Sequence, residues 1–70
     1  MDRFTARRLA HADRQIVEGI GLAIKQREII FEMERNGVDA SKSKGVLEAF
    51  LSQLREFIDY RDKLLRELDA

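Results

Sequence analysis

A single interruption, residues 36–41, constrains this 70-residue chain most, because it divides a sequence without proline into two long stretches rich in helix-forming residues. Gly37 can adopt the left-handed conformation that ends a helix. Val38 can then fold back on Met33, the hydrophobic contact typical of a Schellman ending. The interruption is therefore predicted to end one helix.

A second helix is predicted to begin within a few residues of this stop. Asp39 or Ser41 can accept hydrogen bonds from the free N–H groups of its first turn. Helices over about 3–35 and 41–68 follow, and a connection this short makes them lie antiparallel. The predicted fold class is therefore all-α, with one helical-hairpin domain over residues 1–70.

Both helices carry apolar residues at spacings of three and four, which is typical of a helix with one buried face. The antiparallel arrangement brings Phe31 near Leu47 and makes the two stripes face each other. In the first helix the stripe consists of Leu9, Ala12, Ile16, Ile20, Ala23, Ile24, Ile30 and Phe31. In the second it consists of Leu47, Phe50, Leu51, Leu54, Phe57, Ile58, Leu64, Leu65 and Leu68.

The apolar face of the second helix covers roughly 140° at ~100° per residue, which is wider than contact with one partner helix requires. A chain this short without cysteine cannot support a small core with disulfides. A homodimer that forms a four-helix bundle would cover the remaining surface. The core and dimer interface are then predicted to contain Leu9, Ile16, Ile20, Ile24, Phe31, Leu47, Phe50, Leu54, Phe57, Ile58, Leu65 and Leu68.

A separate apolar strip is predicted on another side of the first helix. At ~100° per residue, its members fall within roughly 40° of one another and about 200° from Leu9. The strip either completes the dimer core or docks a helix of a different protein. It consists of Phe4, Leu22, Ile29 and Met33.

Three charged residues are expected at the seam between the helices. The antiparallel register brings Asp13 within reach of Arg61. Arg27 faces Gln53 but no carboxylate of the second helix, so its expected partner is Glu34 or a residue of the other subunit. Buried polar groups of this kind can fix the register and the oligomeric state.

The composition argues against several classes of function. The 13 basic and 13 acidic side chains cancel, so no whole-molecule field draws the chain to nucleic acid or to an anionic membrane. No apolar run approaches the ~20 residues that span a bilayer, and no signal peptide is evident, so a cytoplasmic location is expected. No spacing typical of a metal site, a cofactor loop or an activated nucleophile occurs, so we expect no catalytic residue, cofactor or metal.

Two more remote alternatives concern the first helix. His11 is the only histidine, and histidine-kinase dimerisation domains are also helical hairpins with a phosphoaccepting histidine. The run His11-Ala12-Asp13-Arg14 lacks the proline of their motif, and its acidic residue is displaced by one position. A cluster of arginines near the N-terminus could instead touch nucleic-acid phosphates, although acidic residues on the same face dilute its charge. This cluster consists of Arg3, Arg7, Arg8 and Arg14.

Three segments of the chain carry sequence motifs. They are Gln26-Arg27-Glu28-Ile29-Ile30, Gly37-Val38-Asp39 and Tyr60-Arg61-Asp62-Lys63-Leu64-Leu65-Arg66-Glu67-Leu68. The motifs resemble those of a group of short, uncharacterised bacterial helical-hairpin proteins, which carry Q-R-x-I-I, then G-x-D, then R-D-x-L-L-x-E-L. The resemblance covers about the second two-thirds of the chain and implies no known activity. It also implies that Arg27 and Arg61 belong to the group's pattern.

These observations predict a non-enzymatic interaction or assembly module that acts as a homodimeric helical bundle. The alternative is a small regulatory adaptor that docks a partner helix through Leu22, Ile29 and Met33 of the separate apolar strip. Both predictions depend on the same property, which is that the chain has more apolar helix surface than one hairpin can cover.

Overall fold

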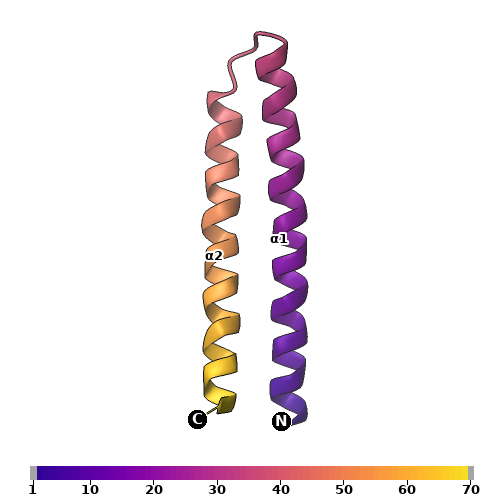
Figure 1. The fold of residues 1–70 in the computed structure, drawn as a ribbon, viewed down its shortest axis with the longest axis vertical. Coiled ribbons are helices and arrows are strands. Elements are labelled where there is room, and N and C mark those ends of the chain that lie inside the picture. Colours follow the sequence, from indigo (N-terminus) through magenta and orange to yellow (C-terminus); the bar gives the residue numbers. More distant parts are fainter. Residues whose placement is uncertain (1, 70) are drawn as a thin grey trace.

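The computed structural model describes residues 2–69, with side chains for residues 2–68. Helix α1 is Arg3–Arg35, and helix α2 is Ser41–Asp69. The two helices lie antiparallel side by side, with the turn at one end and both chain ends at the other (Figure 1). The predicted all-α hairpin is confirmed, and its helix bounds agree with the predicted ones to within one residue.

The turn between the helices ends α1 as the sequence predicts. Gly37 has a φ of +72°, in the left-handed region. The N–H of Val38 donates to the carbonyl of Met33 at 2.8 Å, and the N–H of Gly37 donates to the carbonyl of Glu34 at 3.1 Å. These two hydrogen bonds form a Schellman motif, which satisfies carbonyls that the end of the helix leaves free.

An aspartate just before each helix accepts hydrogen bonds from the first turn of that helix. Asp2 Oδ1 accepts from the backbone N–H of Thr5 at 2.6 Å. Asp39 Oδ1 accepts from the N–H and the hydroxyl of Ser41, at 3.0 and 2.6 Å. Of the two predicted alternatives for the second helix, Asp39 is therefore the acceptor. The hydroxyl and N–H of Ser41 lower the pKa of the Asp39 carboxyl, and the N–H of Thr5 lowers the pKa of Asp2.

Acid is expected to weaken both helix starts. Because the folded-state pKa values of Asp2 and Asp39 lie below their ordinary values, their hydrogen bonds stabilise the fold at neutral pH. That contribution is lost as the pH falls from about 4 through the lowered pKa values. A double variant, Asp2→Asn with Asp39→Asn, keeps an amide oxygen as acceptor but does not titrate. Its thermal midpoint, measured by circular dichroism, is expected to drop less on acidification than that of the unchanged chain. Equal drops would contradict the assignment.

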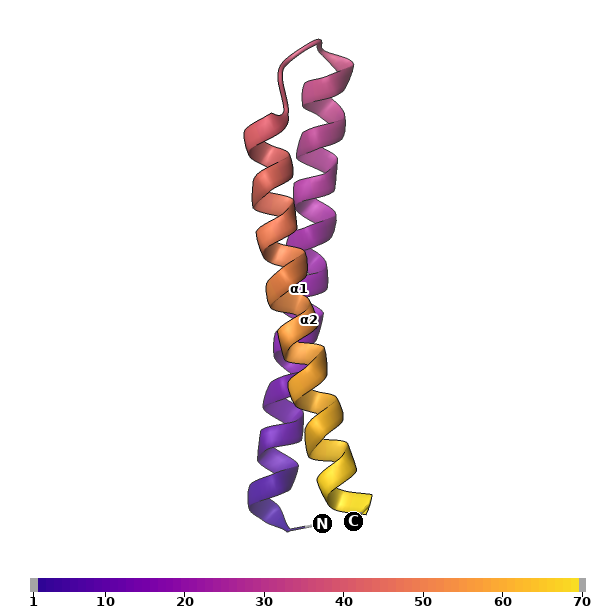
Figure 2. The same ribbon diagram turned by 90° about the vertical axis from the view of Figure 1, so that its left-hand side faces the viewer.

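Where the helices meet, one line of residues on each forms a seam that repeats every seven residues. Spacings along both lines alternate between three and four, and every member is buried or half-buried. A seven-residue repeat makes a helix pair wind around each other, and the helices cross when viewed from the side (Figure 2). The seam contains Thr5, Leu9, Ala12, Ile16, Gly19, Ala23, Gln26, Ile30 and Met33 of α1, and Ser43, Leu47, Phe50, Leu54, Phe57, Arg61, Leu64 and Leu68 of α2.

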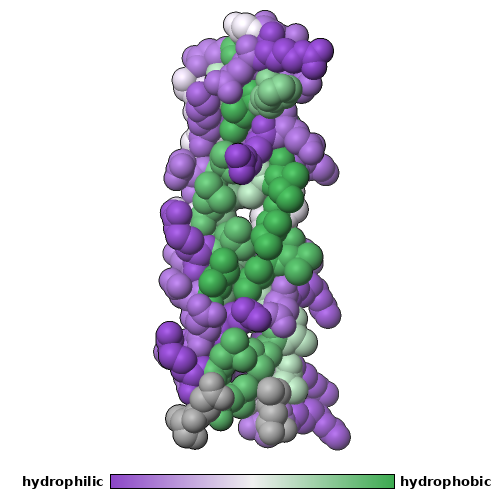
Figure 3. Space-filling view, in the orientation of Figure 1, coloured by the Kyte–Doolittle hydropathy of each residue, from purple (hydrophilic) through white to green (hydrophobic). Residues whose placement is uncertain are grey.

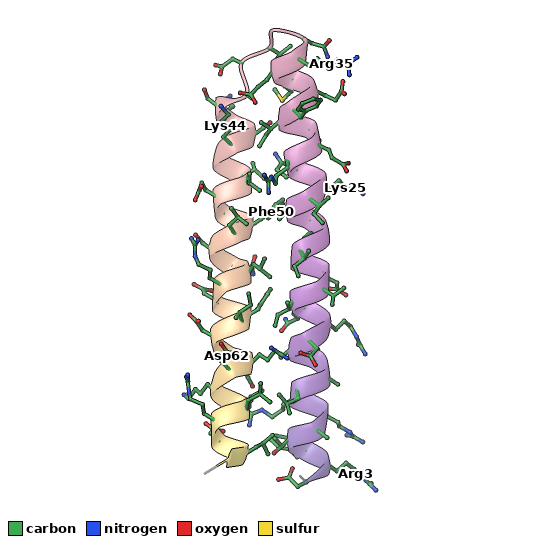
Figure 4. All side chains as sticks on the ribbon, viewed as in Figure 1. Arg3, Lys25, Arg35, Lys44, Phe50 and Asp62 are labelled. Carbon is green, nitrogen blue, oxygen red and sulfur yellow. The ribbon has the colours of Figure 1, made fainter. Side chains whose placement is uncertain are left out.

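Side chains on the ribbon show how narrow this contact is. Phe50 projects from α2 toward α1, whereas Lys25 and Arg35 point away from α2 (Figure 4). Few side chains in the described part of the chain are buried, and no large one is less than 2% exposed. The buried residues are Ala12, Ala23, Ile30, Ala40 and Leu64.

Part of the predicted stripe of α1 is not in the seam. Ile20, Ile24 and Phe31 were expected to face α2, but 44%, 53% and 64% of their surface is exposed. The expectation used ~100° per residue, as in a straight helix, whereas the seam repeats every 3.5 residues. The two descriptions diverge by about 20° per heptad. Over the length of α1 this difference moves Ile24 and Phe31 to the flank of the seam.

The glycines of α1 differ in their surroundings. A Cβ at Gly19 would lie 3.1 Å from Leu54 Cδ1, so Gly19 allows α2 to approach. A Cβ at Gly21 would meet nothing within 4 Å.

Replacing Gly21 with alanine is expected to raise the free energy of unfolding by about 1 kcal/mol, since alanine favours the helix and meets no neighbour. Gly19→Ala gives the same gain in helix propensity but displaces the Leu54 side chain, so it is expected to stabilise less. Urea unfolding of the two variants would measure the difference. A larger gain for Gly19→Ala would show that the approach of Leu54 does not limit this position.

Candidate protein-protein interface

An exposed apolar surface runs along one flank of the seam. On α1 its members follow the same alternation of three and four, offset from the seam. Ile20 and Ile24 line one hollow together with Leu51 and Leu54, which shows that the two helices contribute to the same face. We call this surface the open face. It comprises Val17, Ile20, Ile24 and Phe31 of α1, and Leu51, Ile58 and Leu65 of α2.

The open face is continuous across the hairpin. Hydrophobic surface spreads over both helices for most of their length and is broken by only a few hydrophilic groups (Figure 3). On α1 its members are 44–69% exposed, whereas on α2 Ile58 and Leu65 are 36% and 37% exposed. Exposed apolar patches of this extent are typical of protein interaction sites.

Arg27 stands in the middle of this apolar surface. It lines hollows beside Ile24, Phe31 and Leu47. The expected partner within the chain, Glu34, instead binds Lys44 with a 3.0 Å ion pair. Within the side chains of residues 2–68, Arg27 makes no hydrogen bond or ion pair. Its guanidinium is therefore available to an acidic group outside this hairpin.

Asp13 and Arg61 form the ion pair that the register predicts. The Nε of Arg61 lies 2.6 Å from Oδ1 of Asp13, and the side chains are 40% and 57% exposed. A pair this exposed contributes little to stability. The pair uses Oδ1 of Asp13, and Oδ2 makes no hydrogen bond or ion pair among the side chains of residues 2–68.

The second apolar strip predicted on α1 is not one surface. Met33 lies in the seam, where its sulfur accepts a hydrogen bond from the Ser43 hydroxyl at 3.2 Å. Gln26 Nε2 donates to the Ser43 carbonyl at 3.0 Å beside it. Leu22 and Ile29 do lie on the opposite flank and are 50% and 46% exposed. The wrong placement of Met33 has the same cause as that of Ile24, namely the gradual rotation of the seam.

Near the chain ends, Arg8 joins the helices. Its guanidinium donates to the Tyr60 hydroxyl at 2.7 and 3.0 Å, and its Cζ lies 5.5 Å from the Phe4 ring centre and 5.7 Å from that of Tyr60. Sequence reasoning treated Arg8 as part of a basic cluster and missed this contact. The contact could have been inferred from the predicted pairing of Arg61 with Asp13, because Tyr60 lies one residue before Arg61 and so comes close to the same part of the first helix.

His11 is exposed and lines a shallow hollow with Arg8 and Tyr60. The described residues contain no group of three side chains that could hold a metal ion. Neither helix, over the part of the chain that the structure describes, has an apolar stretch capable of crossing a membrane.

Comparison of the chain with protein-family models gives no match, and comparisons with curated protein sequences and with solved structures give none either. What the molecule does is therefore inferred from its own surface. The feature of that surface that extends along both helices is the open face.

Proposed function

We propose that this chain is a non-enzymatic interaction and assembly module that acts as a homodimeric four-helix bundle. The observation that carries the proposal is the contrast between a narrow seam and a broad open face. The hairpin buries few side chains, yet Ile20, Ile24 and Phe31 remain 44–64% exposed beside it. Covering the open face would place them in a core.

Because the chain is small, covering the open face is important for the stability of the fold. A chain of 70 residues without cysteine has a limited hydrophobic core and no disulfides. Small domains of this kind commonly gain stability by oligomerisation, and a twofold dimer is the commonest soluble oligomer. A second copy offers the same apolar face, so apolar side chains of one copy would be buried against apolar side chains of the other.

The adaptor alternative has less support. Its strip loses Met33 to the seam, and Phe4 lies at the far end beneath the guanidinium of Arg8. Leu22 and Ile29 alone offer a smaller apolar anchor than the open face does. A helix of a different protein is therefore expected to bind less favourably there than a second hairpin binds the open face.

Sedimentation equilibrium at micromolar concentration tests the proposal. A mass of twice 8.2 kDa is expected. The unfolding temperature is also expected to rise with protein concentration, since dimerisation adds to stability by mass action. A stably folded monomer at these concentrations would refute the proposed function.

A further inference from the structure

We propose that two copies of the chain pack antiparallel through the open face, with α1 on α1 of the second copy and Ile20 beside the twofold axis. This arrangement rests on the proposed homodimer and specifies how the second copy is held. In it, Arg27 of each copy binds Asp13 of the other.

The charged residues of the open face are placed symmetrically on α1. Asp13 lies seven residues before Ile20, and Arg27 lies seven residues after it. When two α1 helices run antiparallel about Ile20, each Arg27 therefore falls opposite Asp13 of the second copy. Residues seven apart lie on the same side of a helix in a supercoiled bundle, so both charges face the partner.

The apolar residues of α1 are complementary about a point half a residue away, between residues 20 and 21, so their pairs are staggered by one residue about an axis at Ile20. Val17 falls opposite Ile24 of the second copy, and the large side chain of Phe31 falls opposite the small Ala10. On α2 the same axis brings Leu51 opposite Ile58. Both helices are thus matched by one twofold axis, which is what a symmetric interface requires.

Each partner of the proposed ion pair is free to make it. Arg27 has no hydrogen bond or ion pair among the side chains of residues 2–68. Asp13 uses Oδ1 for Arg61 Nε, at 2.6 Å, and a carboxylate can accept further hydrogen bonds through its other oxygen. The apolar stem of Arg27 would lie along the open face while its guanidinium reaches the edge.

The size of the face suits a dimer. The hairpin is 53 Å long and 15 Å wide, an outline large enough for the roughly 800 Å² that each partner buries in a standard stable interface. The midpoint of α1 lies at residue 19 and that of α2 at residue 55, close to the proposed axis. An axis at this level overlaps the two hairpins along their full length.

A parallel dimer matches the open face less well. It would set α1 against α2 of the second copy at equal levels, which gives Arg27 access to Glu48. It would also place Ile20 against Arg55 and bring Asp13 near Asp62, and like charges across an interface are costly. The antiparallel arrangement also brings like charges together, since the same axis places Arg55 opposite its own copy and Glu48 near Asp62. It is favoured because Ile20 meets Ile20, rather than Arg55, and Leu51 meets Ile58.

Disulfide formation by an Ile20→Cys variant tests the arrangement, since the natural chain has no cysteine. Air oxidation is expected to give a covalent dimer from Ile20→Cys, because two copies of this position meet at the axis. Leu22→Cys, on the opposite flank and similarly exposed, is the matched control and is expected to remain uncrosslinked. When the Val17→Cys and Ile24→Cys variants are mixed, disulfides that join one variant to the other are expected to form in preference to disulfides between two copies of the same variant.

Spin labels on a Val38→Cys variant give an independent measurement. Val38 lies in the turn and is 51% exposed. In the antiparallel dimer the two labels are expected to be separated by nearly the 53 Å length of the hairpin. In a parallel dimer they would lie within about 20 Å, given helix separations of 8–10 Å.

Charge reversal tests the proposed ion pair. Arg27→Glu would face Asp13 of the second copy and is expected to raise the dimer dissociation constant about tenfold or more. Arg35→Glu, at an exposed position that points away from α2, is the control and is expected to change it little. A dimer with close Val38 labels, or one indifferent to Arg27→Glu, would overturn the arrangement while leaving the homodimer. A folded monomer would overturn both proposals.

Discussion

Replacing Ile24 with glutamate is expected to raise the dimer dissociation constant by on the order of 100-fold or more. Ile24 is 53% exposed in the single hairpin, and the proposed dimer removes that surface from water. Burial of an isoleucine side chain contributes about 1.5–3 kcal/mol, and a carboxylate in its place resists burial. Because the dimer is symmetric, the substitution acts twice. Sedimentation equilibrium over a range of concentrations would measure the change.

Leu22→Glu is the control for this experiment. Leu22 is 50% exposed, nearly as much as Ile24, but it lies on the opposite flank of the seam. The same charge is therefore introduced at a similarly exposed position of the same helix. If Leu22→Glu dissociates the dimer as strongly as Ile24→Glu, the interface lies on the other flank and the open face is not the contact surface.

Replacing Leu64 with alanine is expected to lower the free energy of unfolding by about 2–5 kcal/mol, the cost of a large-to-small change in a core. Leu64 is 3% exposed, and no other residue in the buried set is less exposed. Such a loss is a large fraction of the total stability of a small domain. Urea unfolding at fixed protein concentration would measure it.

The matched comparison for Leu64 is Leu22→Ala. It removes the same atoms from a side chain that is half exposed, so the expected loss is less than half as large. Similar losses at the two positions would mean that burial in the seam is not the main source of stability in this hairpin.

Local signals in the sequence were sufficient to predict the helices and the turn. A left-handed position at Gly37 and an acceptor at Asp39 act through hydrogen bonds within a few residues, so they can be identified without the rest of the fold. The pairing of Asp13 with Arg61 followed from the turn, because a short connection fixes which levels of the two helices meet.

The placement of residues around α1 was harder to predict. Ile24 was assigned to the contact with α2, and Met33 to a separate strip, because the sequence was projected onto a straight helix. The supercoil rotates the contact line along the helix, and this rotation depends on how the two helices pack. A seven-residue count along α1 would have given the seam, since small residues such as Ala12 and Gly19 occupy it as well as large ones.

The open face and the Arg8 contact show a second limit on what can be predicted from the sequence. Val17 is 69% exposed and belongs to the open face, but it was not among the predicted interface residues. An apolar residue on a helix flank and one in a seam have the same hydropathy, and only the packing distinguishes them. The hydrogen bond from Arg8 to Tyr60 likewise depends on side chains 52 residues apart.

The Schellman turn also determines the order in which the hairpin can close. The contact between Glu34 and Lys44 joins residues next to the turn, whereas Arg8 and Tyr60 meet across nearly the whole chain. Once Gly37 reverses the chain, each further pair of seam residues can meet after only a few more residues are ordered. The entropic cost of each step is small, because the cost of closing a loop grows slowly with its length. The helices are therefore expected to assemble from the turn outward and to separate first at their free ends. Arg8 and Tyr60 lie near these free ends, so their hydrogen bonds are expected to oppose fraying of the two helices.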